Sequence, residues 1–439
     1  MMQQAYILRR KRFLSKMVPS SAALIYAAPK IMRNANIEYP YRQNSDFWYF
    51  TGLNEPNSLF ILIKHNKNHC RSILFNQMHN NKTNEAYTNL DIEYKAALTC
   101  LNIDYVLPWD EIPKQLYLLF NGLSTIYHAQ GKYIFADYQL FKALNKLRQG
   151  VHKELQAPSI IVDWRSLVNE MRLIKSDEEL TIMRRACEIT AIAHTCAMRR
   201  CRPGMFEYQL EGEVQYEFIR HGARFPSYNI MVGSGKNSCI LHYVKNNKKM
   251  KNGDLVLIDA GCEYKGYASD VTRTFPINGR FSTEQRAVYN IVLKMLNRSL
   301  ELYKPGCSIY AVREEIITIM VAGLIQLGII KGNIEALLAE QAYKKFFMHE
   351  LSHWIGLDVH DVGDYGTSQK DRILVPGMVL TTEPGIYIPS DEKIVSAYHG
   401  IGIRIEETIV ITHSGNENLT ASAVKQANEI EALMTMEFI

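Results

Sequence analysis

Several segments in the second half of the chain are strand-like runs that lead into or contain acidic residues. Residues 255–258 are continuously apolar and precede Asp259, which predicts a strand buried on both faces with a polar last residue. Residues 270–275 are rich in β-branched side chains, and residues 379–382 form a similar run. Residues 401–412 alternate between apolar and polar, as expected for a strand with one buried face. Each segment therefore predicts a strand that positions a carboxylate.

The first part of the chain alternates short strand-like runs with helix-like segments. Residues 22–28, 58–64 and 72–75 predict strands, and residues 138–148 predict a helix. This part contains no cluster of acidic residues and histidines. We therefore expect it to gate the substrate or to mediate assembly.

A helix-capping signal marks the change between the two patterns. Ser176 is followed by Glu179, a capping box that predicts a helix extending to about Arg200. Further helices are expected at about 284–303 and 309–330. A boundary just before the cap gives domains at residues 1–172 and 173–439. The predicted fold class is α+β.

Five residues of the second domain share metal-binding chemistry: Asp259, Asp270, His353, Glu383 and Glu406. A turn through residues 263–266 can bring Asp259 and Asp270 opposite each other, where two ionised carboxylates would repel unless a cation lay between them. Glu406 shares its strand face with Arg404, two residues earlier. A set with many oxygens, one imidazole and no thiolate is typical of a two-metal centre.

A second metal motif overlaps this set. His349, Glu350 and His353 spell H-E-x-x-H, which in zinc peptidases places two histidines on one helix face. The extended pattern needs a third histidine where this chain has Val359, and His360 comes one residue late. The residues that follow favour a strand or loop rather than a helix. The two-metal interpretation is therefore favoured over the zinc-peptidase one.

Composition sets limits on the class of protein. A length of 439 residues favours two domains, and a net charge of +5 does not by itself indicate a nucleic-acid partner, so none is expected. The eight cysteines contain no C-x-x-C pair, which predicts free thiols in a reducing compartment. No secretory signal is visible before Arg9, and the apolar run at 22–28 is too short to cross a bilayer. We therefore expect a cytoplasmic protein without a membrane partner.

Longer strings of the sequence resemble aminopeptidase P of the bacterial type, a member of the pita-bread metallopeptidases. The matching strings of the second domain are PSYNIMVGSGKNSCILHY (226–243), DLVLIDAGCEYKGYASDVTRTFPINGRF (254–281), LSHWIGLDVHDVG (351–363) and GIGIRIEETIVIT (400–412). The string YRQNSDFWYFTGLNEP (41–56) is similar to the N-terminal domain of that family. The resemblance covers nearly the whole chain.

The resemblance implies a C-terminal pita-bread fold, a curved antiparallel sheet with helices outside, preceded by a smaller α/β domain of the creatinase and aminopeptidase P type. It implies two divalent metal ions, with manganese named by the family. Asp270 and Glu406 would bridge the metals, with Asp259 on one metal and His353 and Glu383 on the other. The implied reaction removes the first residue of peptides with proline in second position, by attack of a metal-activated hydroxide. A homo-oligomer, dimer or tetramer, is also implied.

The resemblance also assigns roles around the metals. Glu383 would take the proton of the attacking water and hand it to the leaving proline nitrogen. His242 and His360 would lie at the substrate carbonyl and the proline side, with His349 behind them. Arg404 would orient the carboxylates and compensate their charge. Tyr387, in a strand-like GIYI segment, is a further candidate for this environment.

Two features depart from the family pattern. Glu350 stands where relatives carry glycine, and its carboxylate is expected to favour the charged form of His349. Residues 86–90, AYTNL, replace a Trp-x-Gly-Arg-Arg segment that in relatives helps to shape the active-site mouth from a neighbouring subunit. This leaves the contact between subunits open.

Three other functions compete with this interpretation: two peptidases of the same fold and one binding module that is not an enzyme. Prolidase shares the metal ligands but cleaves only Xaa-Pro dipeptides. Methionine aminopeptidase would not need the first domain. A metal-free binding module with this fold is disfavoured because such proteins generally lack the ligand set, and all five ligands are present here.

Overall fold

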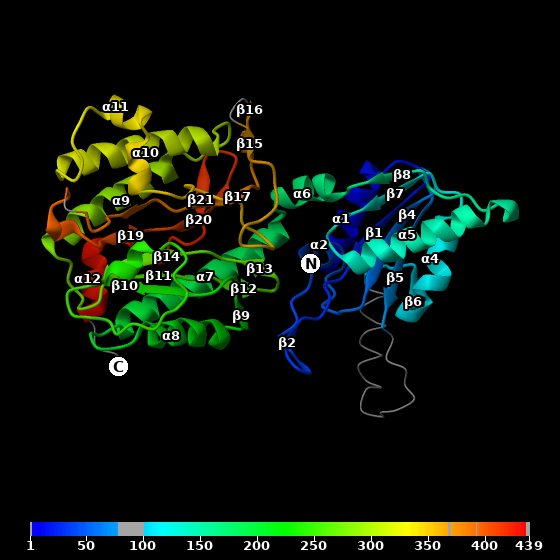
Figure 1. Ribbon diagram of the computed structural model, residues 1–439, viewed down its shortest axis with the longest axis horizontal. Helices are drawn as coiled ribbons and strands as arrows, with labels where there is room; N and C mark the ends of the chain where they lie inside the picture. The colour runs from blue at the N-terminus through cyan, green and yellow to red at the C-terminus, as the bar shows by residue number, and fades with distance from the viewer. Residues whose placement is uncertain (1, 78–100, 368–369, 392, 436–439) are drawn as a thin grey trace. The chain divides into compact units, whose positions relative to one another are not determined.

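The computed structural model describes residues 2–77, 101–367, 370–391 and 393–435 (Figure 1). The described residues form two compact units, and the boundary between them lies between Met171 and Arg172. Among the helices described, none is long and apolar enough to cross a membrane.

The first unit is built on one mixed sheet with the strand order β6-β5-β4-β1-β7-β8. Its strands are β1 (Ser21–Tyr26), β4 (Leu59–Lys64), β5 (Cys70–Asn76), β6 (Tyr105–Pro108), β7 (Thr125–His128) and β8 (Ile160–Val162). β1 pairs antiparallel with β4 and parallel with β7. A separate hairpin joins β2 (Met32–Asn34) to β3 (Ile37–Glu38), and all its strand residues are exposed.

Every residue of β1 and β4 is buried, because helices cover both faces of the sheet. The helices are α1 (Met2–Lys16), α2 (Ser45–Thr51), α4 (Ile112–Phe120) and α5 (Ile134–Gln149), and a further helix, α6 (Arg165–Leu173), contains the boundary between the two units. Alternate strand residues such as Leu24 and Ile61 share a core with Leu116 of α4 and Leu140 of α5. The strands and the helix predicted for this part are thus confirmed within a few residues.

The second unit consists of antiparallel strand pairs with helices around them. Its strands are β9 (Phe225–Pro226), β10 (Met231–Ser234), β11 (Leu255–Asp259), β12 (Cys262–Tyr264), β13 (Tyr267–Ala268), β14 (Thr272–Pro276), β15 (Gly366–Thr367), β16 (Lys370–Asp371), β17 (Val379–Thr382), β18 (Gly385–Tyr387), β19 (Gly402–Arg404), β20 (Glu407–Ile411) and β21 (Asn416–Asn418). Its helices are α7 (Asp177–Arg200), α8 (Glu207–Arg220), α9 (Thr283–Leu302), α10 (Ile309–Gln326), α11 (Ile334–Ala339) and α12 (Ala427–Thr435).

The long helices begin where the sequence predicts. Ser176 caps α7 by accepting from the Glu179 amide, and the Glu179 carboxylate accepts from the Ser176 amide at 2.9 Å. The helices expected near 284–303 and 309–330 are α9 and α10. In Figure 1, α7 and α8 lie on one side of the strands of this unit, and α9 and α10 lie on the other.

β11 and β14 form the first of two ligand-bearing hairpins, with Asp259 opposite Thr272. The chain between them turns at Lys265 and Gly266, both with positive φ. Gly261 allows the two arms to approach closely, since a Cβ there would lie 1.7 Å from the Ser269 carbonyl oxygen. The predicted turn and return strand are thus confirmed.

The second ligand-bearing region pairs β17 with β20 and β18 with β19. The alternating segment 401–412 is two strands rather than one, because the chain leaves the ladder at Ile405 and Glu406. There the Ile405 amide donates to the Pro384 carbonyl, and the Glu406 amide donates to the Thr272 carbonyl at 3.1 Å. The break thereby connects this region to β14.

Candidate metal centre

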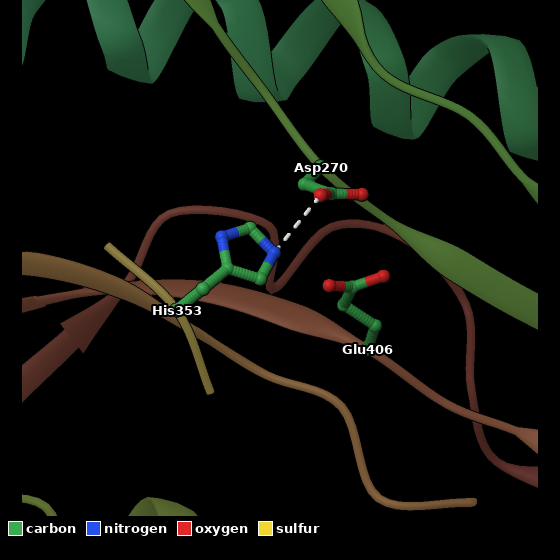
Figure 2. Close-up of side chains that lie close together, drawn as sticks. All are labelled: Asp270, His353 and Glu406. Atoms are coloured by element: carbon green, nitrogen blue, oxygen red, sulfur yellow. Dashed lines mark ion pairs between the residues drawn. The ribbon is translucent and has the colours of Figure 1, made fainter. Parts of the chain in front are cut away.

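Three predicted ligands meet in one cluster. Asp270, His353 and Glu406 each offer a ligand atom, and these atoms lie within 4.8 Å of one another (Figure 2). The carboxylates are 5% and 2% exposed, and His353 is partly buried. Asp270 stands just before β14 and Glu406 in the break between β19 and β20, so the two hairpins deliver one acid each.

The hydrogen bonds of His353 leave one ring nitrogen facing the acids. Its Nδ1 donates to the Trp354 carbonyl at 3.0 Å, which assigns the ring proton to that nitrogen. Its Nε2 lies 3.4 Å from an Asp270 oxygen and 3.6 Å from a Glu383 oxygen. The main chain of His353 is fixed by Thr381, whose amide donates to it at 2.9 Å. An unprotonated Nε2 among carboxylates is the form that binds a metal.

Asp259 and Asp270 share a hydrogen-bond donor that the sequence analysis missed. The Tyr228 hydroxyl lies 2.6 Å from an Asp259 oxygen and also contacts Asp270. Burial and the nearby Asp259 raise the pKa of Tyr228 well above its usual value, so the phenol stays neutral. Tyr228 lies in the quoted string 226–243, but no local pattern distinguishes it from a core tyrosine.

The buried acids carry more negative charge than the surrounding protein neutralises. Burial and repulsion from Asp259 raise the pKa of Asp270 to about 8. Burial and repulsion from Asp270 raise the pKa of Glu406, and burial together with Glu406 raises that of Glu383. Bound cations would relieve this repulsion, and oxygen ligands with one imidazole suit a hard or borderline dication. The residues present therefore fit a divalent metal centre.

Arg404 connects the remaining acid to this network. Its guanidinium pairs with the Asp259 carboxylate and donates to the Tyr387 hydroxyl at 2.8 Å. Its Nε donates to the Thr272 hydroxyl at 3.0 Å, and that hydroxyl donates to Glu406 at 2.7 Å. Arg404 and Glu406 thus face the same side, as the alternation predicted.

All of these acids line one pocket of about 870 Å³. The other predicted residues in its wall are His242, His349, His353, His360 and Arg404. His242 and His360 are exposed there, and the His360 ring packs edge-on against His353 with centroids 4.4 Å apart. Burial and the neighbouring His353 lower the pKa of His360. The structure therefore brings every predicted site residue to one place.

His349 differs from its predicted charge state. Its Nε2 lies 2.8 Å from the Tyr387 hydroxyl, and its Nδ1 lies 2.8 Å from the Glu350 carbonyl. Burial and the positive Arg404 lower the pKa of His349 to about 3 and outweigh the opposing effect of the Glu350 carbonyl, so His349 is not in the charged form that the Glu350 carboxylate was expected to favour. The Glu350 carboxylate instead lies 3.0 Å from the Arg313 guanidinium, with its side chain 70% exposed.

The zinc-peptidase alternative requires a helix that is absent from this described segment. Residues 349–353 have no helical structure, so His349 and His353 do not share a helix face. The H-E-x-x-H string is therefore not a zinc-binding helix.

Comparison with known proteins places this centre in a family. The model of metallopeptidase family M24 matches residues 181–413, and the model of the aminopeptidase P N-terminal domain matches residues 6–127. The chain is 58% identical over 432 residues to an Xaa-Pro aminopeptidase of Escherichia coli (strain K12), covering 98% of each chain. This chain belongs to metallopeptidase family M24. It is accordingly a hydrolase of the metal-dependent aminopeptidase type.

Solved structures agree with this family along the whole chain. The proline aminopeptidase P II from Yersinia pestis is 58% identical, has a TM-score of 0.94 and covers 99% of each chain. Zn-substituted E. coli aminopeptidase P in complex with product is 56% identical, has a TM-score of 0.94 and covers 98% of each chain. The predicted fold, an aminopeptidase P N-terminal domain before a pita-bread domain, is therefore confirmed. The departing segment 86–90 lies outside the described residues.

Proposed function

We propose that this M24 hydrolase uses two manganese ions to remove the N-terminal residue from peptides that carry proline in second position. The observation that carries the proposal is the cluster of Asp270, His353 and Glu406 at the wall of a pocket that also holds His242 and His360. Similarity to Xaa-Pro aminopeptidases over nearly the full chain supports the choice of substrate.

Five side chains would hold the metals. Asp270 and Glu406, one from each ligand-bearing region, would hold them together with Asp259, His353 and Glu383. When bound, two dications supply an activated water and polarise the carbonyl of the first peptide bond. The oxygen-rich donor set supports manganese.

Glu383 is the proposed proton carrier. It follows β17 directly, its side chain is 17% exposed, and its carboxylate lies 3.6 Å from His353 and 3.5 Å from His349. From this position it can take a proton from the attacking water and deliver it to the proline nitrogen. Such delivery is needed because, without a proton, the proline nitrogen would have to leave as a strongly basic amide anion.

The remaining pocket residues bind and orient. His242 and His360 have exposed imidazoles in the pocket wall and would meet the substrate carbonyl and the proline side. His349 is neutral and hydrogen-bonds Tyr387, and Arg404 bonds the same hydroxyl while pairing with Asp259. These contacts would hold the acids in place as the charge on the substrate changes.

The location and assembly of the protein are proposed on other grounds. The described cysteines are free thiols, which supports a reducing cytoplasm. Apolar side chains stand exposed on the β2–β3 hairpin, including Ile31, Met32 and Ile37, and this supports a homo-oligomer. Light scattering of the purified chain would test it, since a monomer at micromolar concentration would contradict it.

Amino-acid release from matched peptides tests the function. Metal-stripped protein reloaded with manganese would receive Xaa-Pro-Xaa, Xaa-Ala-Xaa and the dipeptide Xaa-Pro, with unloaded protein as the control. Manganese-dependent cleavage of the first peptide alone is expected. Cleavage confined to the dipeptide would make the protein a prolidase, and metal binding without any cleavage would favour a binding module.

A further inference from the structure

A fully buried arginine lies next to the metal cluster without lining the pocket. Arg273 of β14 has no exposed surface, and each of its five N–H donors has an acceptor. One acceptor is the carboxylate of Glu407, at 2.8 Å. The others are main-chain carbonyl oxygens of Thr272, Glu406, Ala423 and Val424. Arg273 thus joins β14, the start of β20 and the segment before α12.

Two of these bonds act on the main chain of a metal-ligand candidate and its neighbour. Nη1 of Arg273 donates to the Glu406 carbonyl at 2.6 Å and to the Thr272 carbonyl at 2.9 Å. The Glu406 amide in turn donates to that Thr272 carbonyl. Because Glu406 lies in the break between β19 and β20, no regular strand ladder fixes its main chain. The guanidinium supplies the missing constraint.

The charge of this arginine is not explained by stability alone. Arg273 and Glu407 are both completely buried, and Lys425 lies 3.0 Å from the same Glu407 oxygen. Well-packed apolar residues commonly replace such buried pairs without loss of stability. The planar guanidinium donates to five acceptors at fixed angles, and an apolar side chain could not bind any of them.

We propose that Arg273 is a positioning residue of the metal centre. Its bonds to the Glu406 and Thr272 carbonyls hold the Glu406 carboxylate where a metal needs it. The proposal rests on the proposed two-metal site, and it concerns metal affinity rather than the identity of the peptide cleaved.

The test is Mn²⁺ binding by metal-stripped full-length protein, measured by titration calorimetry. Arg273→Lys keeps the charge but offers three donors from one point, so it cannot reach all the acceptors. Its Mn²⁺ affinity is expected to fall by about 10- to 100-fold at the site that Glu406 serves. Arg172→Lys is the matched control. Arg172 is 2% exposed and pairs with Asp361, which is not in the metal cluster. The Mn²⁺ affinity of the Arg172→Lys variant should therefore stay within about twofold of the parent value.

A folded Arg273→Lys protein with parental Mn²⁺ affinity would overturn the proposal, as would an equal loss in the Arg172→Lys control. Should Arg273→Lys not fold, Glu407→Gln decides, because it leaves both Nη1 bonds in place. If Glu407→Gln is less stable but keeps the parental Mn²⁺ affinity, the result supports positioning by the Nη1 bonds. If it loses Mn²⁺ affinity tenfold, the effect belongs to the Arg273–Glu407 ion pair, and the proposal is overturned. A parent protein that binds no Mn²⁺ would refute the two-metal function itself, which is a separate outcome.

Discussion

Removing the metals should make the stability of the second unit depend on pH in an unusual direction. The pKa of Asp270 is raised to about 8 by burial and by Asp259. In the unfolded chain an aspartate loses its proton near pH 4. Between these values the folded protein holds a proton that the unfolded chain has lost, so the free energy of unfolding falls as pH rises.

The expected size follows from this one proton. A difference of one bound proton changes the free energy of unfolding by about 1.4 kcal/mol for each pH unit. Between pH 5 and pH 8 Asp270 alone would therefore remove up to about 4 kcal/mol, a large share of a typical domain stability. The pKa values of Glu383 and Glu406 are raised as well and change the stability in the same direction. Bound metal should abolish this loss, because it binds the ionised carboxylates.

Native-state hydrogen exchange of peptides from residues 255–276 would measure this free energy in the unit concerned. Metal-stripped protein should lose protection from pH 5 to pH 8, after correction for intrinsic exchange rates, and manganese-loaded protein should not. Asp270→Asn is the control, because it removes one titrating group and should make the dependence shallower, while Glu383 and Glu406 keep the rest of it. Stability of the stripped protein that is constant or rises over this range would refute the reasoning.

Three further outcomes test individual contacts. Asp270→Asn should abolish peptide cleavage and remove one equivalent of bound metal while the circular dichroism spectrum is unchanged; retained turnover would contradict the two-metal scheme. Tyr228→Phe removes the hydroxyl shared by two carboxylates and should lower the free energy of urea unfolding by about 1–2 kcal/mol, so an unchanged value would deny it this role. Gly261→Ala should cost more than about 3 kcal/mol in urea unfolding, because its Cβ would collide with the Ser269 carbonyl. Gly415→Ala, which meets no atom within 4 Å, is its control, and equal losses in both variants would dismiss the collision.

Local signals were sufficient for the elements and for the ligand types. The Ser176–Glu179 capping box and the apolar run before Asp259 each depend on neighbours in the sequence, and both predict structure that is observed. The four acidic metal-ligand candidates were recognisable because carboxylates at the ends of buried strands need an explanation, and His353 adds the one imidazole of the set. All of them line the pocket.

Contacts between distant segments were not predictable in this way. Tyr228 meets Asp259 and Asp270 only through the tertiary fold, and its own neighbourhood in the sequence carries no sign of this. The break at Glu406 depends on the Thr272 carbonyl of another strand, so the alternation alone indicated one continuous strand. Arg273 stands in the predicted strand 270–275, and nothing in that segment indicates that its side chain is completely buried.

The order of the ligands along the chain has a consequence for biosynthesis. Asp259 and Asp270 come early in the second unit, whereas Glu406 and the carbonyl acceptors of Arg273 at Ala423 and Val424 come close to its end. A nascent chain therefore lacks the Glu406 carboxylate, and the carbonyl acceptors behind it, until residues 406–424 have been translated. Chains that stop before these residues have neither, so they cannot assemble the proposed metal centre.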